Sequence, residues 1–397
     1  AVILITHDLT VVRQFSDYVY VMRRGEVKEH NTTEALFANP RHEYTRHLLA
    51  SEPRGRALPF PADSPVIIEG KDIRVAYTLK SGGFFRPEYK ELVAVNSLSL
   101  AVRKQETLGL VGESGSGKTT FGQAMIRLIH MDAGRVLFDG QSIEKHSREE
   151  MRPLRSRIQI VFQDPFSSLN PRMTLLELVG EPMVIHGVGS EGEIRDRVAE
   201  LLRLVGLRPE YLNRYPHAFS GGQRQRIGIA RALALNPSFI AADEAVSALD
   251  VSVAAQNINL MQDLQEQFGL TYLFITHDLG MVEHISDRIG VMYLGRLMEV
   301  GPTDEMFAKP LHPYTEALLA AVPQPDPRGN RTRKRVPLKG EIADAMNIPT
   351  GCPFHPRCPY ADAKCRGEVP ELRMLPSGRQ VRCHYAETLD LVGVAAA

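Results

Sequence analysis

The stretch GESGSGKTT at residues 112–120 limits the fold of this chain more than any other feature. It fits the pattern G-x-x-x-x-G-K-[ST], and it stands between the apolar segment 107–112 and a helical pattern that runs from Lys118 to about His130. Its glycines let the backbone turn tightly, so that successive N–H groups converge on phosphate oxygens at the start of the helix. The stretch therefore predicts a strand–loop–helix unit that binds a nucleotide through its phosphates.

Two side chains of this phosphate loop have predicted roles of their own. Lys118 is expected to bridge the β- and γ-phosphates of ATP, and the Thr119 hydroxyl is expected to ligate Mg²⁺. The predicted cofactors are therefore ATP and Mg²⁺. The nucleotide-binding residues predicted in the loop are Gly112, Glu113, Ser114, Gly115, Ser116, Gly117, Lys118, Thr119 and Thr120.

An acidic pair follows another apolar segment, in FIAADE at residues 239–244. A phosphate loop needs a carboxylate at the end of a neighbouring strand, because Mg²⁺ and the attacking water must be held there. Asp243 is suited to an outer contact with the Mg²⁺, and Glu244 is placed to polarise the water. The pair therefore predicts ATP hydrolysis in addition to ATP binding.

Apolar strands alternate with helical patterns beyond the phosphate loop. Strands that are apolar throughout and are separated by helices indicate a covered, largely parallel sheet. The predicted fold class is therefore α/β. The predicted strands are 107–112, 158–163, 238–243 and 271–276. The predicted helices are 118–130, several helices with proline and glycine breaks in 171–236, and 251–268.

A second cluster of backbone donors is predicted in RYPHAFSGGQRQRIGIARAL, residues 214–233. Ser220, Gly221 and Gly222 stand where a helix would begin, which places N–H groups and the positive end of a helix dipole at this point. A single domain cannot direct both helix starts at one nucleotide, so another part of the protein must cover that nucleotide. A second protomer is the natural supplier of the second helix start.

At these residues the sequence resembles the ATP-binding subunits of ABC transporters, over nearly the whole chain. FQDP (162–165) resembles the Q-loop of that family, SALD (247–250) its D-loop, and THD (276–278) its switch-histidine motif. The resemblance implies a P-loop NTPase of the ABC ATPase type, with an antiparallel β part, a helical subdomain at about 165–235, and two ATPs sandwiched between paired domains. It implies catalytic roles for Glu244, His277 and Gln163, Mg²⁺ contacts for Thr119, Gln163 and Asp243, adenine stacking for Tyr77, and nucleotide contacts for Ser220, Gly221, Gly222, Gln223 and Asp250.

The N-terminus repeats a later part of the chain. Residues 1–53 match residues 271–323 without a gap at 23 positions, among them Asp17/Asp287 and Gly25/Gly295. A match of this length indicates duplication. The second copy starts near Val66, so we expect the chain to be the C-terminal part of a longer twin-domain protein. We expect no function for His7, which aligns with His277. The predicted domains are 1–58 (the end of a first ATPase domain), 59–65 (linker), 66–322 (complete ATPase domain) and 323–397 (C-terminal region).

All four cysteines lie in that last region, in the order Cys352, Cys358, Cys365 and Cys383. Their spacing contains no C-x₂-C pair of the kind that structural zinc sites favour, and disulfides are disfavoured in a cytosolic ATPase. The tail resembles that of peptide-importer ATPases in which four thiolates hold a [4Fe–4S] cluster, and four cysteines are the required number. An iron–sulfur cluster, zinc and no metal all stay open.

Several segments resemble the oligopeptide/dipeptide/glutathione importer branch of the family, including RYPHAFSGGQ and HPYTEALLAAVP. ADEAVSALDVSV (242–253), with Ala245 where most relatives carry proline, resembles the twin-domain glutathione-import ATPases, whereas the cysteine tail favours a broader peptide importer. The resemblance implies a bacterial importer's ATP-hydrolysing subunit, peripheral on the cytoplasmic face of the inner membrane. Its expected partners are a second ATPase domain, integral-membrane permeases docked between FQDP and residues 171–215, and, indirectly, a periplasmic solute-binding protein.

Composition bears on the alternatives. The chain has 47 basic and 47 acidic residues, so its charge does not favour nucleic acid as a partner. It has no apolar run of the roughly 18 residues that a membrane-spanning helix needs. One rival hypothesis is a soluble ABC ATPase acting on ribosomes or DNA, for which the only basic cluster is RGNRTRKR (328–335). Another is a truncated fragment that binds nucleotide without driving transport.

Overall fold

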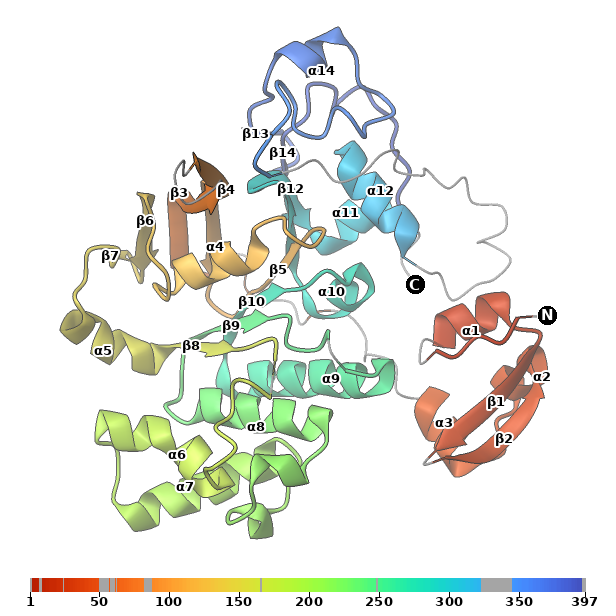
Figure 1. The fold of residues 1–397 in the computed structure, drawn as a ribbon, viewed down its shortest axis with the longest axis vertical. Helices are drawn as coiled ribbons and strands as arrows, with labels where there is room; N and C mark the ends of the chain where they lie inside the picture. The colour runs from red at the N-terminus through yellow and green to blue at the C-terminus, as the bar shows by residue number, and fades with distance from the viewer. Residues whose placement is uncertain are drawn as a thin grey trace.

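The computed structural model describes residues 2–6, 9–23, 25–49, 57, 61, 63–81, 88–164, 166–247, 249–322 and 345–394. Figure 1 shows a small N-terminal unit, a large central part built around a sheet, and a C-terminal region that lies beside the end of that sheet. His7, residues 328–335 and residues 59, 60 and 62 of the predicted linker 59–65 lie outside the described residues.

The main sheet has eight strands in the order β13-β14-β12-β11-β5-β10-β9-β8. From β11 to β8 all neighbours are parallel, and β12, β14 and β13 add an antiparallel edge. Every residue of β5, β9 and β10 is buried, which explains why these strands are apolar throughout and confirms the predicted α/β class. The bounds are β5 (Thr107–Val111), β8 (Ile158–Val161), β9 (Phe239–Asp243), β10 (Thr271–Ile275), β11 (Arg288–Tyr293), β12 (Arg296–Pro302), β13 (Arg373–Met374) and β14 (Gln380–Val381).

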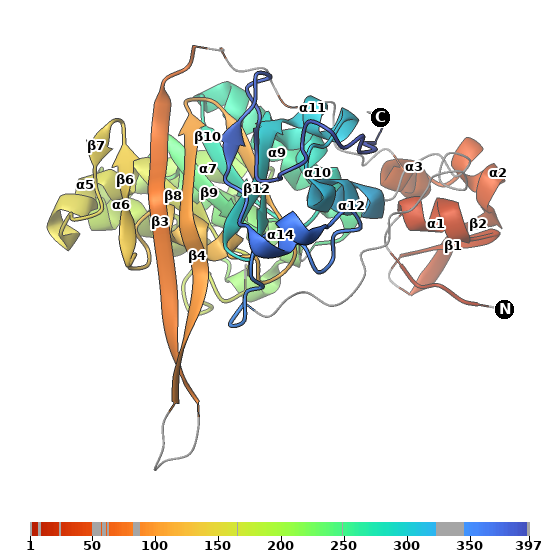
Figure 2. The ribbon, with the colours of Figure 1, turned by 90° about the horizontal axis from the view of Figure 1, so that it is seen from above.

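A second, antiparallel sheet has the order β4-β3-β6-β7. Its strands are β3 (Val66–Ser81), β4 (Glu88–Arg103), β6 (Ala133–Phe138) and β7 (Gln141–Ser142), and Figure 2 shows β3 and β4 extending together beyond the rest of the domain. Helix α4 (Lys118–Met125) contacts both sheets, and its Phe121 and Met125 belong to one buried cluster with Ile68 of β3 and Ile275 of β10. The phosphate loop is therefore attached to a helix that is fixed on both sides.

Helices cover the other face of the main sheet, and their starts are set by the sequence. Thr174, Ser190 and Ser220 each cap a helix through a reciprocal bond with the Glu or Gln three residues later. Helix α9 has the predicted bounds, whereas α4 ends before the predicted His130 because Arg127 adopts a left-handed φ of 58°. The helices are α6 (Leu175–His186), α7 (Glu191–Leu204), α8 (Gly221–Leu233), α9 (Val251–Phe268) and α10 (Leu279–Ile285). Helix α5 (Arg148–Arg157) instead packs through Met151 into the buried cluster that contains α4.

The N-terminal unit repeats a piece of the main domain. Strands β1 (Tyr18–Arg23) and β2 (Glu26–Thr32) form a two-stranded antiparallel sheet, and α1 (Leu9–Phe15), α2 (Thr33–Ala38) and α3 (Glu43–Leu49) surround it. Its counterparts in the second copy are α10, β11, β12, α11 (Thr303–Ala308) and α12 (Pro313–Ala321). In both views the unit lies to one side of the main domain (Figures 1 and 2).

The C-terminal region joins the main sheet through β14, which pairs with β12, and it contains the short helix α14 (Ala363–Gly367). Its Phe354 ring packs against Tyr293 of β11 and Tyr314 of α12, with ring centroids 5.5 and 5.2 Å away. None of the helices in the described part of the chain is both long and apolar enough to serve as a membrane span.

Candidate functional site

The candidate site lies where three neighbouring parallel strands end. Strands β5, β10 and β9 are adjacent in the sheet and point the same way, so the residues that follow them meet at one edge. The phosphate loop follows β5, Asp243 ends β9, and His277 comes two residues after β10. Residues more than 100 positions apart in the sequence therefore share one edge.

The phosphate loop has the tight backbone that its glycines predict. Gly117 caps helix α4 with a φ of 97°, and a Cβ at this position would lie 2.1 Å from the carbonyl oxygen of Ala94. Lys118 is 4% exposed, and its ammonium donates to the carbonyl oxygens of Gly112 and Glu113 at 2.7 and 3.0 Å. Burial lowers the pKa of Lys118, and the charges of nearby carboxylates, Glu244 first among them, partly oppose that shift.

Thr119 and Asp243 present oxygens side by side. The Thr119 hydroxyl donates to Asp243 Oδ1 at 2.8 Å. Burial raises the pKa of Asp243, and the hydrogen bond from Thr119 partly offsets this increase. Mg²⁺ prefers oxygen ligands and usually takes only one or two from the protein, with the rest from phosphates and water. The oxygens of Thr119 and Asp243 therefore fit this ion in kind.

Glu244 is the point at which the other predicted catalytic residues meet. Gln163 Nε2 donates to Glu244 Oε2 at 2.6 Å, and His277 Nδ1 lies 3.3 Å from Glu244 Oε1. The Glu244 backbone is held in a left-handed conformation (φ 45°) by a hydrogen bond from its N–H to the Ile275 carbonyl. Its side chain is 15% exposed, whereas that of His277 is 54% exposed. The arrangement aims a carboxylate and an imidazole at the same edge of the sheet as Lys118.

Ser247, the first residue of the D-loop-like SALD, also joins this group, although we predicted no role for its side chain. Its hydroxyl donates to the Glu244 carbonyl at 2.9 Å and lies 3.2 Å from the carboxylate oxygen Oε2. The signal that could have found it is the spacing, because a serine three residues after a turn carboxylate is positioned to bond back to it.

The second predicted helix start is formed as expected. Ser220 Oγ accepts the N–H of Gln223, and Gln223 Oε1 accepts the N–H of Ser220, so the pair makes a capping box at the start of α8. Gly222 lies against α9, where an added Cβ would come within 2.2 Å of a Val253 methyl group. Asp250 is the N-cap of α9 but its side chain makes no cap hydrogen bond. Tyr77 lies on β3, paired with Leu92, and 42% of it is exposed.

The sequence of this chain is similar to those of known nucleotide-binding proteins, which agrees with the site described above. The profile of the ABC transporter family matches residues 95–247. The oligopeptide transport ATP-binding protein AppF of Bacillus subtilis (strain 168) is 52% identical over 324 residues, which cover 81% of this chain and 98% of AppF. This chain belongs to the ATP-binding proteins of ABC transporters.

Two further comparisons place this ATP-binding protein within the family. The glutathione import ATP-binding protein GsiA of Salmonella typhimurium (strain LT2) is 49% identical over 367 residues, which cover 86% of this chain and 59% of GsiA. The dimeric ATP-binding cassette MJ0796, bound to ADP and phosphate after hydrolysis, superposes with a TM-score of 0.53 at 30% identity, covering 60% of this chain and 99% of MJ0796. The profile of the C-terminal region of oligopeptide/dipeptide transporters matches twice, at residues 29–60 and 298–365, which agrees with the duplication.

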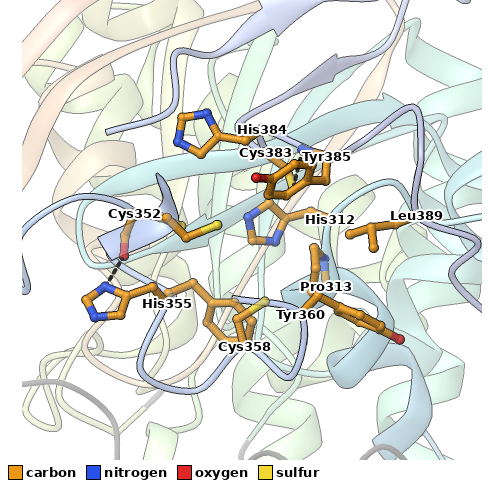
Figure 3. A pocket seen from close by; sticks show the side chains of 12 residues that line it. His312, Pro313, Cys352, His355, Cys358, Tyr360, Cys383, His384, Tyr385 and Leu389 are labelled. Carbon is orange, nitrogen blue, oxygen red and sulfur yellow. Dashed lines mark hydrogen bonds between the residues drawn. The ribbon is translucent and has the colours of Figure 1, made fainter. Parts of the chain in front are cut away.

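The C-terminal region of this ATP-binding protein carries a pocket lined by all four cysteines. Figure 3 shows Cys352 and Cys358 beside His312, and the same pocket is lined by Cys365 and Cys383. Burial raises the pKa of Cys352 to about 11 and that of Cys358 to about 12, so both thiols are protonated at neutral pH unless a cation displaces the proton. Four thiols fit an iron–sulfur cluster in number and kind. Among the residues that the structure describes, however, no three histidine, cysteine or carboxylate side chains are grouped so as to hold a metal ion.

The phosphate loop also contacts this C-terminal region, which the sequence analysis missed. Arg357 forms an ion pair with Glu113, and the Tyr314 hydroxyl accepts a hydrogen bond from the Glu113 N–H. Arg357 stands 244 positions after its partner. No local pattern could have revealed this pair, because its two residues lie so far apart in the sequence.

Proposed function

We propose that this chain is the ATP-hydrolysing subunit of a bacterial ABC importer for peptides, either di- and oligopeptides or glutathione. The observation that carries the proposal is the meeting of Gln163 and His277 on Glu244, beside Lys118 and Thr119. Relatives named for oligopeptide transport and glutathione import support the substrate class. We also propose that the chain divides into domains after residues 58, 65 and 322, as the repeat suggests.

The proposed mechanism follows from this geometry. The phosphate loop binds the ATP phosphates through its N–H groups and Lys118, and Tyr77 stacks on the adenine. Thr119, Gln163 and Asp243 would hold Mg²⁺, which supplies charge neutralisation to the phosphates when it is bound. Glu244 orients and polarises the attacking water.

The other residues of the site belong to the closed dimer. Ser220, Gly221, Gly222 and Gln223 at the start of α8 would cap the phosphates held by a partner ATPase domain, and Asp250 would lie near the same interface. Binding of ATP would close the two domains and hydrolysis would reopen them. The proposed partners are that second domain, integral-membrane permeases and, indirectly, a periplasmic solute-binding protein, with this chain peripheral on the cytoplasmic face of the inner membrane.

The test of the catalytic assignment is Glu244→Gln. The variant keeps the size of the side chain but cannot act as a base, so we expect it to bind ATP and form a stable dimer while turnover falls by at least about a hundredfold. The matched control is Glu266→Gln, an exposed position on α9, which should hydrolyse ATP at the wild-type rate. Hydrolysis by Glu244→Gln at the wild-type rate would refute the assignment.

The test of the transport assignment is co-purification from the native membrane. An importer subunit should be recovered with permease subunits, and in reconstituted vesicles its ATPase rate should rise with the imported peptide. Recovery with ribosomes or DNA would instead support the rival soluble ATPase. Hydrolysis that no permease or peptide alters would support a nucleotide-binding fragment without transport activity.

The cysteine pocket extends the proposal to a further cofactor. Four thiols in one pocket support a [4Fe–4S] cluster held by Cys352, Cys358, Cys365 and Cys383. The test is metal analysis of protein purified without oxygen, with a serine variant of each cysteine as control. Iron with acid-labile sulfide, lost in the variants, is the expected result. Zinc, or protein free of metal, would each refute the cluster.

A further inference from the structure

The Glu113 carboxylate is held by a buried arginine from the C-terminal region. Arg357 Nη1 donates to Glu113 Oε2 at 2.6 Å, and Nη2 donates to Oε1 at 2.9 Å. The arginine side chain is 6% exposed and the glutamate side chain 21% exposed. Two parallel bonds between a guanidinium and a carboxylate fix the direction of the carboxylate and are stronger than neutral hydrogen bonds.

The backbone of Glu113 is held from the same side. Its N–H donates to the Tyr314 hydroxyl at 2.9 Å, and the Tyr314 side chain is fully buried. The Tyr314 ring packs against Phe354, which lies three residues before Arg357. Both the carboxylate and the amide of this loop residue are therefore held by one packed group of side chains.

The charge of Glu113 is unfavourable where it stands. Glu113 belongs to the loop that receives the ATP phosphates, and an unpaired carboxylate there would repel them. Its negative charge also acts on Lys118, where it opposes the lowering of the lysine pKa that burial causes. A carboxylate released from Arg357 could pair with Lys118 and compete with the phosphates for its ammonium group.

We propose that Arg357 is a positioning residue for ATP, which neutralises the Glu113 carboxylate and holds it away from the phosphates. The nucleotide affinity of the ATPase domain thus depends on the C-terminal region, through one ion pair. This inference rests on the proposed ATP-binding function. It assigns to the C-terminal region a contribution to the nucleotide site that does not require any metal in the cysteine pocket.

The experiment is calorimetric titration of MgATP into Arg357→Met, made together with Glu244→Gln so that no hydrolysis occurs. Methionine keeps the packing of the apolar stem and removes the charge. We expect the dissociation constant for ATP to rise about tenfold, the size expected for one uncompensated charge within roughly 10 Å of the phosphates in a partly buried site. Arg357→Lys, which keeps the charge but not the two parallel bonds, should show a rise of only about two- to threefold.

A second substitution separates charge from packing. In Arg357→Met/Glu113→Gln the repelling carboxylate is gone, so ATP affinity should return to within about twofold of its starting value. The defect of Arg357→Met should be smaller for ADP than for ATP, and it should shrink as ionic strength rises from roughly 0.05 to 0.5 M. Arg373→Met is the matched control, because Arg373 pairs with Glu387 within the same C-terminal region, and it should leave the affinity unchanged.

Two results would overturn the inference. One is an Arg357→Met protein that binds ATP as tightly as its parent. The other is a double variant that stays as weak as Arg357→Met, which would show that the arginine acts through packing alone. A parent protein that binds no ATP at all would instead refute the proposed function on which the inference depends.

Discussion

The two copies of the repeated hairpin have the same local structure and opposite surroundings. In β1–β2, Tyr18 pairs with Thr32, and the register shifts at Val21/Met22. In β11–β12, Arg288 pairs with Pro302, and the register shifts at Val291/Met292, each pair displaced by 270 positions. Yet Met22 is 57% exposed, whereas Met292 is fully buried. The local sequence therefore sets the hairpin and its irregularity, and the neighbouring strands set its burial.

One pair of carboxylates shows the physical effect of that difference. Glu29 accepts the backbone N–H groups of Arg41 and His42, and Glu299 accepts those of Leu311 and His312. Desolvation is the largest single influence on the pKa of both carboxylates. At Glu29 it is outweighed by the hydrogen bonds, and the pKa is lowered. At Glu299, which is completely buried, desolvation dominates and the pKa is raised despite the ion pair with Arg379.

The largest expected effect is therefore at Glu299. Glu299→Ala would leave the buried charge of Arg379 without an opposite charge, and we expect it to lower the free energy of unfolding by about 3–5 kcal/mol. Glu29→Ala should cost no more than about 1 kcal/mol, since water can replace the lost bonds. Urea unfolding followed by circular dichroism measures both. Equal losses in the two variants would contradict the difference in burial.

The histidines of the two copies should differ in activity. His277→Ala removes the imidazole beside Glu244, and we expect ATP turnover to fall about a hundredfold. His7→Ala, at the aligned position, should hydrolyse ATP at the wild-type rate. A coupled assay of phosphate release, which gives kcat and KM separately for each variant, would check this. A loss of turnover in His7→Ala would show that the first copy has a catalytic role.

The two methionines compare packing without any charge. Met292→Ala opens a cavity in the core and should lower the free energy of unfolding by about 2–3 kcal/mol. Met22→Ala should change it by no more than about 0.5 kcal/mol. Hydrogen exchange resolved by segment would assign each loss to its own hairpin. A large effect of Met22→Ala would show that another surface covers β1.

The smallest expected effect is a pH dependence at Asp287, the residue before β11. Burial raises its pKa to about 7, far above the ordinary value of 3.8. Between these two values the folded state retains a proton that the unfolded state has lost, so the contribution of Asp287 to stability is greatest below pH 4 and falls as the pH rises to about 7. Asp287→Asn cannot titrate and should remove about 1–2 kcal/mol of that decrease between pH 5 and 8. Urea midpoints across this range measure it, and an unchanged slope would refute the assignment.

The parts of the site that were predictable are those encoded by short motifs. The phosphate loop, the Asp243–Glu244 pair and the start of α8 depend on glycines, capping residues and apolar strands that stand close together in the sequence. Propensity and local hydrogen bonding decide such features, so the sequence is sufficient for them. Helix α9 shows the same, since its bounds agree with the predicted 251–268.

The parts that were not predictable depend on residues far apart in the chain. The strand β14 has only two residues, which show no periodicity, and it joins the sheet only because β12 offers an unpaired edge. The pair between Glu113 and Arg357 depends in turn on how the C-terminal region folds back over α12. The early end of α4 at Met125 was missed because a left-handed residue, Arg127, carries no distinctive sequence signal.

The position of β10 in the main sheet has a consequence for how the molecule forms. β10 lies between β5 and β9, yet it follows both in the chain. During synthesis β5 and β9 therefore emerge without a shared neighbour, and the edge that carries Lys118 and Asp243 closes only when residues 271–275 insert between them. Such late, long-range pairing makes folding slow. The nucleotide can bind only after the sheet is complete. Binding of ATP would therefore stabilise correctly folded chains and shift the folding equilibrium towards them.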